Sequence, residues 1–224
     1  MLCFILVAVV AYLLGSIPFG FLAAKARGID IRTAGSGNIG ATNALRVLGK
    51  PLGIIVLLLD VFKGWFACFS GVLIGAGFFA ANHSGLSSYD ASTAINPPPL
   101  DRFALLAGIC AVLGHNYTCW LKFKGGKGIA TTAGVYLALA PWPLLIALVV
   151  FLLAVALTRY VSVGSIAGAI ALPVAVWVLT PDNLLLGAVT TALGALAIYK
   201  HKGNLQRLRA GTENRLGRKA GSNQ

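Results

Sequence analysis

The sequence predicts an all-α membrane protein, a bundle of seven transmembrane helices with its N-terminus outside and its C-terminus in the cytoplasm. Of the 224 residues, 58% are apolar and only 11% are charged, whereas a soluble domain carries about 25% charged residues. The apolar residues gather in long runs, and the 18 lysines and arginines, against 6 aspartates and glutamates, lie almost entirely between these runs. This arrangement excludes an ordinary soluble enzyme and favours a membrane over nucleic acid as the partner of the basic charge.

Five apolar runs are the clear candidates for membrane spans, since a spanning helix needs about 17–25 mostly apolar residues. They are Leu2–Ala24, Leu52–Ala80, Phe103–Leu121, Val163–Leu179 and Leu184–Tyr199. The first run has no basic residues before it and leads directly into Lys25, so it is interpreted as a retained helix rather than a signal peptide. The four cysteines form no Cys-x-x-Cys pair, which argues against a zinc site or a disulfide framework.

The stretch Ile129–Thr158 is too long for one ordinary span. Pro141 and Pro143 lie in its middle, where proline removes a backbone donor and disfavours helix just before it. We therefore expect two helices here, the first of them a short helix over Thr131–Ala140. This division raises the number of spans to seven.

The distribution of basic residues supports seven spans. With seven, every lysine and arginine is cytoplasmic except Lys63, which lies within a span, and Arg102, which lies outside. That pattern obeys the positive-inside rule, whereas a single span over Ile129–Thr158 would export the whole C-terminal tail. The prediction is one membrane domain over 1–224, with an outside loop at Asn82–Leu100 and a cytoplasmic basic tail at 200–224.

Three segments on the predicted cytoplasmic side hold most of the polar residues. The first, Gly35–Arg46, matches the dinucleotide pattern G-x-G-x-x-G, but that motif needs a preceding strand, and here a membrane helix and a basic linker precede it. What remains is a glycine-rich turn whose amides can cradle an oxyanion, with the guanidinium of Arg46 able to grip phosphate. The structural alternative is a helix-capping loop with a basic residue at the membrane surface.

The second segment runs from Lys124 through Gly125, Gly126 and Lys127 to Gly128. Glycines around a lysine just before a helix predict an anion site made of bare amides, the helix N-terminus and an ammonium group. It is not a Walker A loop, because no glycine lies five residues before Gly126 and glycine replaces the Ser/Thr. The alternative is a simple positive-inside hairpin, which needs the lysines but not the glycines.

The third segment contains His201, Asn204 and Glu213. His201 and Asn204 are three apart, so they share one face if the last helix continues through them. The alternative for this basic tail is binding of anionic headgroups. Asp60 and Lys63 are also three apart, within the second span, where a structural pair and a role on the substrate side are both open.

Several kinds of catalytic motif do not occur in the sequence. There is no Gly-x-Ser-x-Gly elbow and no His-x-x-x-x-Asp box, and few carboxylates can reach the predicted inside face. We therefore expect no metal and no cofactor. From these residues alone, an enzyme acting on phosphate compounds, a phosphate-ester transporter and a lipid-binding scaffold all remain open, although no internal repeat supports a transporter.

The three segments together resemble the PlsY family, the membrane acyl-phosphate:glycerol-3-phosphate acyltransferases of bacteria. Ser36 to Asn43 is similar to that family's first motif, and Gly114-His115 through Lys124–Gly128 is similar to its second. His201-x-x-Asn204 with Gly211-x-Glu213 resembles the third. The resemblance covers nearly the whole chain in order and spacing, and the main departure is a longer loop at Asn82–Leu100.

This resemblance implies a multi-pass protein of the bacterial cytoplasmic (inner) membrane, with its active site at the cytoplasmic face. It implies transfer of an acyl group from acyl phosphate to the 1-hydroxyl of sn-glycerol 3-phosphate, giving lysophosphatidic acid and phosphate at the start of phospholipid synthesis. The expected partners are these two substrates and membrane lipid, with no nucleic acid, no cofactor and no metal. The sequence makes no prediction of the oligomeric state.

The resemblance also implies roles for individual residues. It assigns catalysis to Ser36, Arg46, Lys127, His201 and Asn204. It assigns substrate binding to Gly37, Asn38, Asn43, Lys124, Gly125, Gly126 and Gly128, and supporting roles to His115 and Glu213. The proton of the attacking hydroxyl goes either to an oxygen of the donor phosphate or to His201 as general base.

Overall fold

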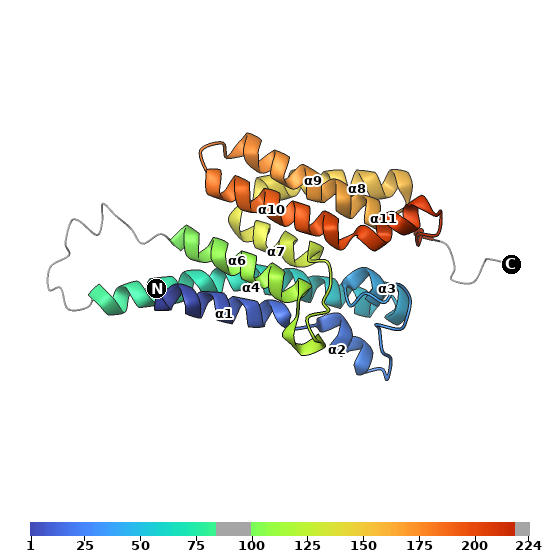
Figure 1. Ribbon diagram of the computed structural model, residues 1–224, viewed down its shortest axis with the longest axis horizontal. Helices are drawn as coiled ribbons and strands as arrows, with labels where there is room; N and C mark the ends of the chain where they lie inside the picture. Colours follow the sequence, from blue (N-terminus) through green and yellow to red (C-terminus); the bar gives the residue numbers. More distant parts are fainter. Residues whose placement is uncertain (84–99, 218–224) are drawn as a thin grey trace. The chain divides into compact units, whose positions relative to one another are not determined.

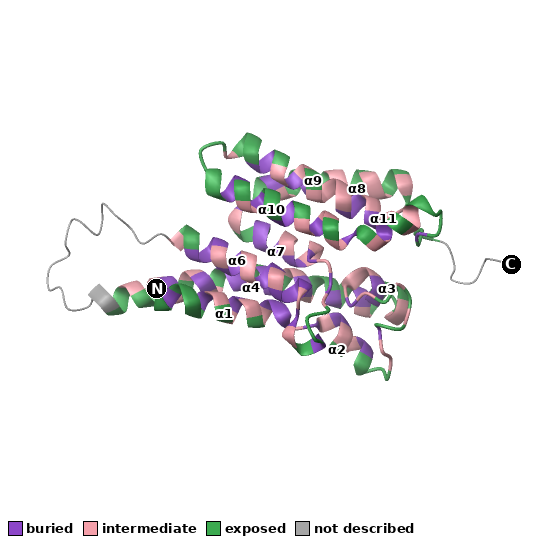
Figure 2. Ribbon diagram, viewed as in Figure 1, coloured by how far each residue is buried: buried purple, intermediate pink, exposed green. Residues whose placement is uncertain are grey.

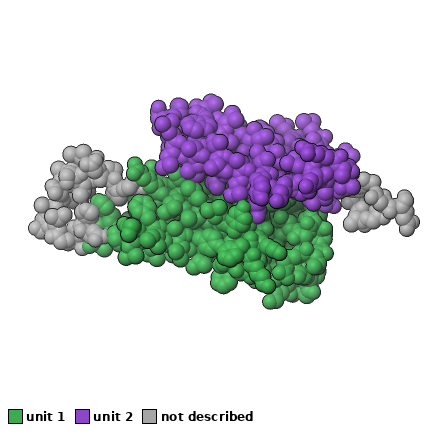
Figure 3. Space-filling model, in the orientation of Figure 1, with its two compact units in different colours: residues 1–139 green, residues 140–224 purple. Residues whose placement is uncertain are grey.

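The structure, a computed structural model, describes residues 1–83 and 100–217. Within these ranges every regular element is a helix and there is no strand (Figure 1), so the predicted all-α class is confirmed. The chain divides into two compact units, residues 1–139 and residues 140–224 (Figure 3). Most of the predicted outside loop and the end of the basic tail, residues 84–99 and 218–224, lie outside the described residues. A single domain over 1–224 stays a prediction.

The first unit is built on three long helices, α1 (Leu2–Ser16), α4 (Lys50–His83) and α6 (Leu100–Asn116), which pack against one another (Figure 1). Its shorter elements are α2 (Phe19–Lys25), α3 (Ala41–Leu48), the 3-10 turn η1 (Cys119–Leu121) and α7 (Ile129–Leu139). Glycines let these backbones approach closely: a side chain at Gly15 of α1 would overlap the backbone of Ala111 in α6. Contacts through small residues are typical of helices that pack in membranes.

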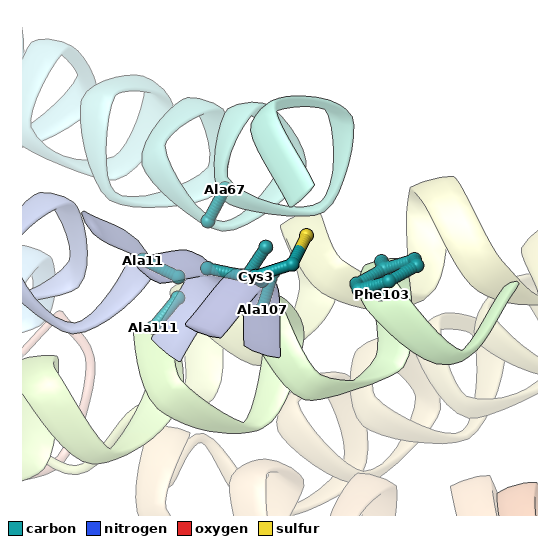
Figure 4. Close-up of a cluster of buried hydrophobic side chains, with 7 residues drawn as sticks. Cys3, Ala11, Ala67, Phe103, Ala107 and Ala111 are labelled. Atoms are coloured by element: carbon teal, nitrogen blue, oxygen red, sulfur yellow. The ribbon is translucent and has the colours of Figure 1, made fainter. Parts of the chain in front are cut away.

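A cluster of mostly small apolar side chains fills the space between α1, α4 and α6 (Figure 4). Its members are Cys3, Val7 and Ala11 of α1, Ala67 of α4, and Phe103, Ala107 and Ala111 of α6. The ring of Phe103 also stacks on Phe4, with 4.5 Å between the ring centroids. Because alanine side chains take little room, the three helices pack tightly and set the positions of the segments that leave their ends.

The first predicted span, Leu2–Ala24, is broken into two helices. Helix α1 ends at Ser16 and α2 begins at Phe19, with Pro18 between them. Proline has no N–H to continue the helix and disfavours helical geometry at the residue before it, here Ile17. The two helices still form one candidate span over Leu2–Lys25 by length and composition.

The second unit contains α8 (Pro141–Thr158), α9 (Val161–Leu179), α10 (Leu184–Lys200) and the short α11 (Lys202–Arg209). Helix α9 packs against both α8 and α10. The break predicted within Ile129–Thr158 is confirmed, since α7 ends at Leu139 and α8 begins at Pro141. Prolines in the first turn of α8 are tolerated because the N–H groups there have no partner within the helix.

Many outward-facing residues of both units are apolar and exposed, as expected of helices that face lipid. Figure 2 shows exposed positions along α8 and α9. Leu153, Leu157 and Val178 are among the exposed apolar residues of these two helices. Among the described residues, five helical stretches are long and apolar enough to cross a membrane, or six if the bent pair α10–α11 is one span. Helix α7 is apolar but shorter. The count of seven and the orientation of the termini stay predictions.

Candidate active site

The first polar segment forms a glycine-rich loop between α2 and α3. Gly35 and Gly37 have φ angles of +60° and +72°, a left-handed conformation that L-residues with side chains rarely adopt. Gly37 is exposed, while Ser36 and Asn38 are half-buried. Asn38 stabilises the entry to α3, because its Oδ1 accepts a hydrogen bond from the backbone N of Gly40 at 2.8 Å.

Asn43 fixes the backbone of this loop from its buried side. Its Oδ1 accepts a hydrogen bond from the backbone N of Ser36 at 2.8 Å, and its Nδ2 donates to the carbonyls of Ala34 and Asn38 at 3.0 and 2.8 Å. The side chain is only 1% exposed. Direct substrate binding by Asn43 stays a prediction. In the structure its side chain is the internal frame of a loop whose outer surface carries Ser36 and Gly37.

Arg46 and the linker before the loop supply the charge of this region. Arg46 is an exposed residue in the last turn of α3. In the linker, Arg32 forms an ion pair with Asp30 at 2.7 Å, and its guanidinium lies 5.0 Å from the centre of the Phe21 ring. Hydrogen bonds from the side chain and then the backbone of Arg32 lower the pKa of Asp30 to about 2. The Asp30 carboxylate is therefore charged and paired at neutral pH.

The second polar segment lies against the C-terminal end of α6. The backbone N of Gly126 donates to the carbonyl of His115 at 2.9 Å, and that of Gly125 donates to the carbonyl of Asn116 at 3.3 Å. A side chain at Gly126 would overlap the His115 imidazole, and one at Gly125 would overlap the His115 carbonyl. Only glycine fits at these two positions without a shift of the backbone or of His115, because the loop lies in direct contact with α6.

The expectation of bare amides is therefore wrong for Gly125 and Gly126. The last carbonyls of a helix lack partners within it, and these two N–H groups satisfy two of them in α6. The part of the segment still suited to an anion is its end, where Lys127 and Gly128 (φ +81°) lead into the first turn of α7. Lys127 is half-buried and Lys124 is exposed.

Both segments belong to the first unit and share an apolar cluster. Ile39 of the first loop and Leu121 of η1, just before the second segment, are buried in the same cluster. Its other members are Ala24, Ile31, Ala44 and Val56. The structure thus brings the first loop close to the turn that leads into the second segment, although α4 and α6 lie between them along the chain.

A buried group of ionisable side chains lies close to these segments. Asp60 Oδ1 is 2.8 Å from Lys63 Nζ and 3.6 Å from His115 Nδ1. Lys63 also donates to the carbonyl of Ile17 at 2.9 Å. A structural pair and a role on the substrate side were both open for Asp60 and Lys63, and the structure shows that the two side chains form an ion pair.

The third segment belongs to the second unit, and the last helix does not continue through it. Helix α10 ends at Lys200, and α11 departs at 50° from it after His201. His201 and Asn204 are both buried, at 3% and 7% exposure. Nδ1 of His201 lies 2.7 Å from the carbonyl of Ala197. A carbonyl only accepts, so the proton belongs on Nδ1, and a neutral ring then carries its lone pair on Nε2.

Glu213 connects the residues of this segment through its hydrogen bonds. Its Oε1 accepts hydrogen bonds from Asn204 Nδ2 at 2.7 Å and Ser162 Oγ at 3.0 Å, and its Oε2 accepts from Arg207 Nε at 2.8 Å. Burial on its own would raise the pKa of Glu213, but these hydrogen bonds and the charge of Arg207 outweigh it and lower the pKa. Glu213 therefore orients Asn204 as a carboxylate. Ser162 was missed from the sequence, since nothing in its local pattern marks it.

The comparisons with known proteins agree with one another. The family model described as glycerol-3-phosphate acyltransferase matches residues 5–211. The chain is 43% identical over 212 residues to a glycerol-3-phosphate acyltransferase of Geobacter sulfurreducens, covering 95% of this chain and 97% of the relative. It is also 43% identical to that of Synechococcus elongatus over 224 residues, covering 100% and 99%.

Two solved structures share the fold. Both are crystal structures of PlsY, described as an integral membrane glycerol 3-phosphate acyltransferase. The glycerol 3-phosphate form superposes with a TM-score of 0.78 at 36% identity and covers 96% of each chain. The lysophosphatidic acid form superposes with a TM-score of 0.74 at 37% identity, covering 96% of this chain and 95% of the other.

Proposed function

The chain belongs to the PlsY family of integral membrane glycerol-3-phosphate acyltransferases, and on that premise we propose its reaction in full. It transfers an acyl group from an acyl phosphate to the 1-hydroxyl of sn-glycerol 3-phosphate, giving 1-acyl-glycerol 3-phosphate and inorganic phosphate. The observation that carries the proposal is the presence, in one compact unit, of two neighbouring segments suited to phosphate. Two such sites are what a reaction between two phosphate-bearing substrates requires.

The first loop is the proposed site for glycerol 3-phosphate. Its outer surface offers Ser36, Gly37 and Asn38 on a backbone that Asn43 holds in place. Arg46 is the guanidinium of this segment, and its planar fork can bind phosphate through two parallel hydrogen bonds. A loop fixed before the substrate arrives loses little entropy on binding.

The proposed donor site is the end of the second segment. Lys127 and Gly128 precede α7, whose N-terminal N–H groups and helix dipole favour an anion. Lys124 is exposed on the same segment and adds positive charge. An acyl phosphate placed here has its phosphate on the protein, while its chain can remain among apolar surfaces of the helices and the lipid.

Acyl phosphate already carries a good leaving group, so the proposed reaction is direct. The 1-hydroxyl oxygen attacks the acyl carbonyl carbon, the bond from that carbon to the phosphate oxygen breaks, and phosphate departs. The hydroxyl proton passes to the departing phosphate. The alternative acceptor is His201, for which the Nδ1 contact with Ala197 supports a basic Nε2.

The protein contributes alignment and charge to this reaction. Arg46 and Lys127 offset the repulsion between two anionic substrates, and fixed binding sites hold hydroxyl and carbonyl in the geometry of attack. Within the third segment, Glu213 orients the side chain of Asn204, for which we propose a catalytic role. None of these steps requires a metal or a cofactor.

We further propose that the protein crosses the bacterial inner membrane seven times, with the N-terminus outside and the three segments at the cytoplasmic face. The confirmed break at Ala140 supports seven spans, since it gives α7 and α8 as separate helices. The basic residues support the orientation, because Lys122, Lys124, Lys127 and Arg159 then lie on the cytoplasmic side with the polar segments.

The test is an assay of the purified protein in lipid with labelled glycerol 3-phosphate and either acyl phosphate or acyl-CoA. We expect labelled lysophosphatidic acid and released phosphate with acyl phosphate, and essentially no product with acyl-CoA. Equal rates with the two donors would refute the proposed donor. Uptake of glycerol 3-phosphate into vesicles without acylation would indicate a transporter, and binding of lipid alone would indicate a scaffold.

A further inference from the structure

Three buried ionisable side chains form one connected group in the first unit. Asp60 and Lys63 lie one turn apart on α4, and His115 lies in the last turn of α6. Their exposed fractions are 2%, 3% and 5%. Asp60 Oδ1 lies 2.8 Å from Lys63 Nζ and 3.6 Å from His115 Nδ1, so the carboxylate joins the other two. We refer to these three residues as the Asp60 cluster.

One end of the Asp60 cluster reaches the second polar segment. The carbonyl of His115 accepts a hydrogen bond from the backbone N of Gly126 at 2.9 Å. The imidazole of His115 occupies the space that a side chain at Gly126 would need. The loop therefore rests on the His115 ring, and the carboxylate of Asp60 lies beside that ring, with Oδ1 3.6 Å from Nδ1. Lys127 follows Gly126 directly, so a shift of the ring moves the proposed donor site.

The other end of the cluster reaches the break between α1 and α2, just before the helix that contacts the first polar segment. Lys63 Nζ donates to the carbonyl of Ile17 at 2.9 Å, at the proline break between α1 and α2, and lies 5.5 Å from the centre of the Phe19 ring. Helix α2 in turn touches the first loop, since a side chain at Gly20 would overlap the carbonyl of Ile39. Lys63 thus fixes the helix on which that loop rests.

We propose that Asp60, Lys63 and His115 are positioning residues that set the distance and angle between the two phosphate-binding segments. This inference rests on the proposed function of those segments. A buried ion pair is weak evidence for stability, because apolar replacements of similar volume often do as well. Alignment offers a stronger account: two anionic substrates must meet in one geometry, and a misplacement of about 1 Å can cost about 100-fold in rate.

The decisive variant is the double substitution Asp60→Asn/Lys63→Met. It removes both charges together, so it leaves no unpaired buried charge and separates positioning from folding. We expect a melting temperature close to that of the wild type. We also expect the KM for acyl phosphate to rise about tenfold or more and kcat/KM to fall for both substrates. A double variant with wild-type KM and kcat values would overturn the proposal.

His115→Asn is the second variant, in case the double variant does not fold. Asparagine adds no charge and keeps a polar group near the position of Nδ1, but it removes the part of the ring that supports Gly126. The same rise in the KM for acyl phosphate is expected, and a KM within about threefold of the wild type would overturn the proposal. The matched control is Asp101→Asn, an exposed acid at the opposite end of α6 from His115, which should change neither constant.

Lys127→Met distinguishes failure of this inference from failure of the proposed function. If Lys127→Met raises the KM for acyl phosphate while the double variant and His115→Asn leave it unchanged, only the positioning role is refuted. If Lys127→Met itself leaves that KM unchanged, the second segment is not the donor site and both proposals fall. A rise in KM for all three variants, with Asp101→Asn unchanged, supports the positioning role.

Discussion

The side-chain oxygen of Asn43 accepts a hydrogen bond from the backbone N of Ser36 at 2.8 Å. A residue in the first turn of α3 thus sets the position of a residue seven places earlier in the chain. The same side chain donates to the carbonyls of Ala34 and Asn38. One buried amide therefore holds the shape of the loop that is proposed to bind glycerol 3-phosphate.

Asn43→Ala should destabilise the protein and weaken binding of glycerol 3-phosphate. The substitution leaves buried backbone groups unpaired, so we expect the free energy of unfolding to fall by about 1–3 kcal/mol. We also expect a higher KM for glycerol 3-phosphate. Asn38→Ala removes one hydrogen bond at a half-buried position and should cost only about 0.5–1.5 kcal/mol. Unfolding curves in detergent measure both values, and a wild-type curve for Asn43→Ala would contradict the framing role.

Arg46→Lys should impair use of the acceptor while leaving the fold and topology intact. Lysine keeps the charge but lacks the planar fork that binds phosphate through two parallel hydrogen bonds. Losing that interaction in a partly desolvated site should cost about 2–4 kcal/mol, or about 30- to 1000-fold in kcat/KM for glycerol 3-phosphate. The measurement is steady-state kinetics of the purified variant at saturating acyl phosphate.

The control for Arg46→Lys is Arg209→Lys, at the exposed end of α11, which should leave kcat/KM for glycerol 3-phosphate nearly unchanged. If Arg46→Lys also stays within about threefold of the wild type, then Arg46 only anchors the chain at the membrane surface, and the acceptor site lies elsewhere.

Glu213→Gln should loosen the third segment. The carboxylate accepts hydrogen bonds on both oxygens, whereas glutamine has one oxygen and a donating amide nitrogen. That nitrogen would face either Arg207, or Asn204 and Ser162, which are donors themselves, so a hydrogen bond is lost. Losing one hydrogen bond to a charged group should lower the free energy of unfolding by about 1.5–3 kcal/mol. Asn214→Ala, at the exposed neighbouring position, is the matched control and should leave stability unchanged.

The effect of Glu213 on stability should depend on pH. Its pKa is lower in the folded protein, so the carboxylate stabilises the fold above the ordinary glutamate pKa of about 4.3. That contribution is lost as the pH falls through the lower, folded pKa. The difference in melting temperature between wild type and Glu213→Gln should therefore be constant near neutral pH and shrink below about pH 4. A difference that grows on acidification would show that Glu213 is not bound as a carboxylate.

The proposed topology places the outside loop and the C-terminal tail on opposite sides of the membrane. Single cysteines at Ser88 and Ser222, both outside the described residues, should react oppositely with an impermeant maleimide in intact cells. The background must lack the native residues Cys3, Cys68, Cys110 and Cys119. Labelling at Ser88 and none at Ser222 is expected. Labelling of both would place the C-terminal tail outside. With the N-terminus also outside, the number of spans would then be even, which excludes seven.

The helices and their breaks were largely predictable from the sequence. Long apolar runs, proline positions and the placement of basic residues are local signals, because a helix satisfies its backbone hydrogen bonds within its own segment. The break before Pro141 was predicted, since proline acts on its immediate neighbours. The short helix expected over Thr131–Ala140 begins and ends slightly earlier in the structure, at Ile129 and Leu139. The break at Pro18 follows the same rule but was hidden inside an apolar run long enough to be one span.

The motifs were also visible in the sequence, but the hydrogen-bond partners of the residues within them were decided by tertiary structure. Glycine spacing marked the second segment, yet only the approach of α6 shows that the Gly125 and Gly126 amides bond its last carbonyls. The contact of Lys63 with Ile17 spans 46 residues, and that of Ser162 with Glu213 spans 51. Periodicity carries no information at such separations, because these partners meet only once the helices pack. The sequence by itself determined the membrane class and the polar segments, and packing decided which atoms in them hold one another.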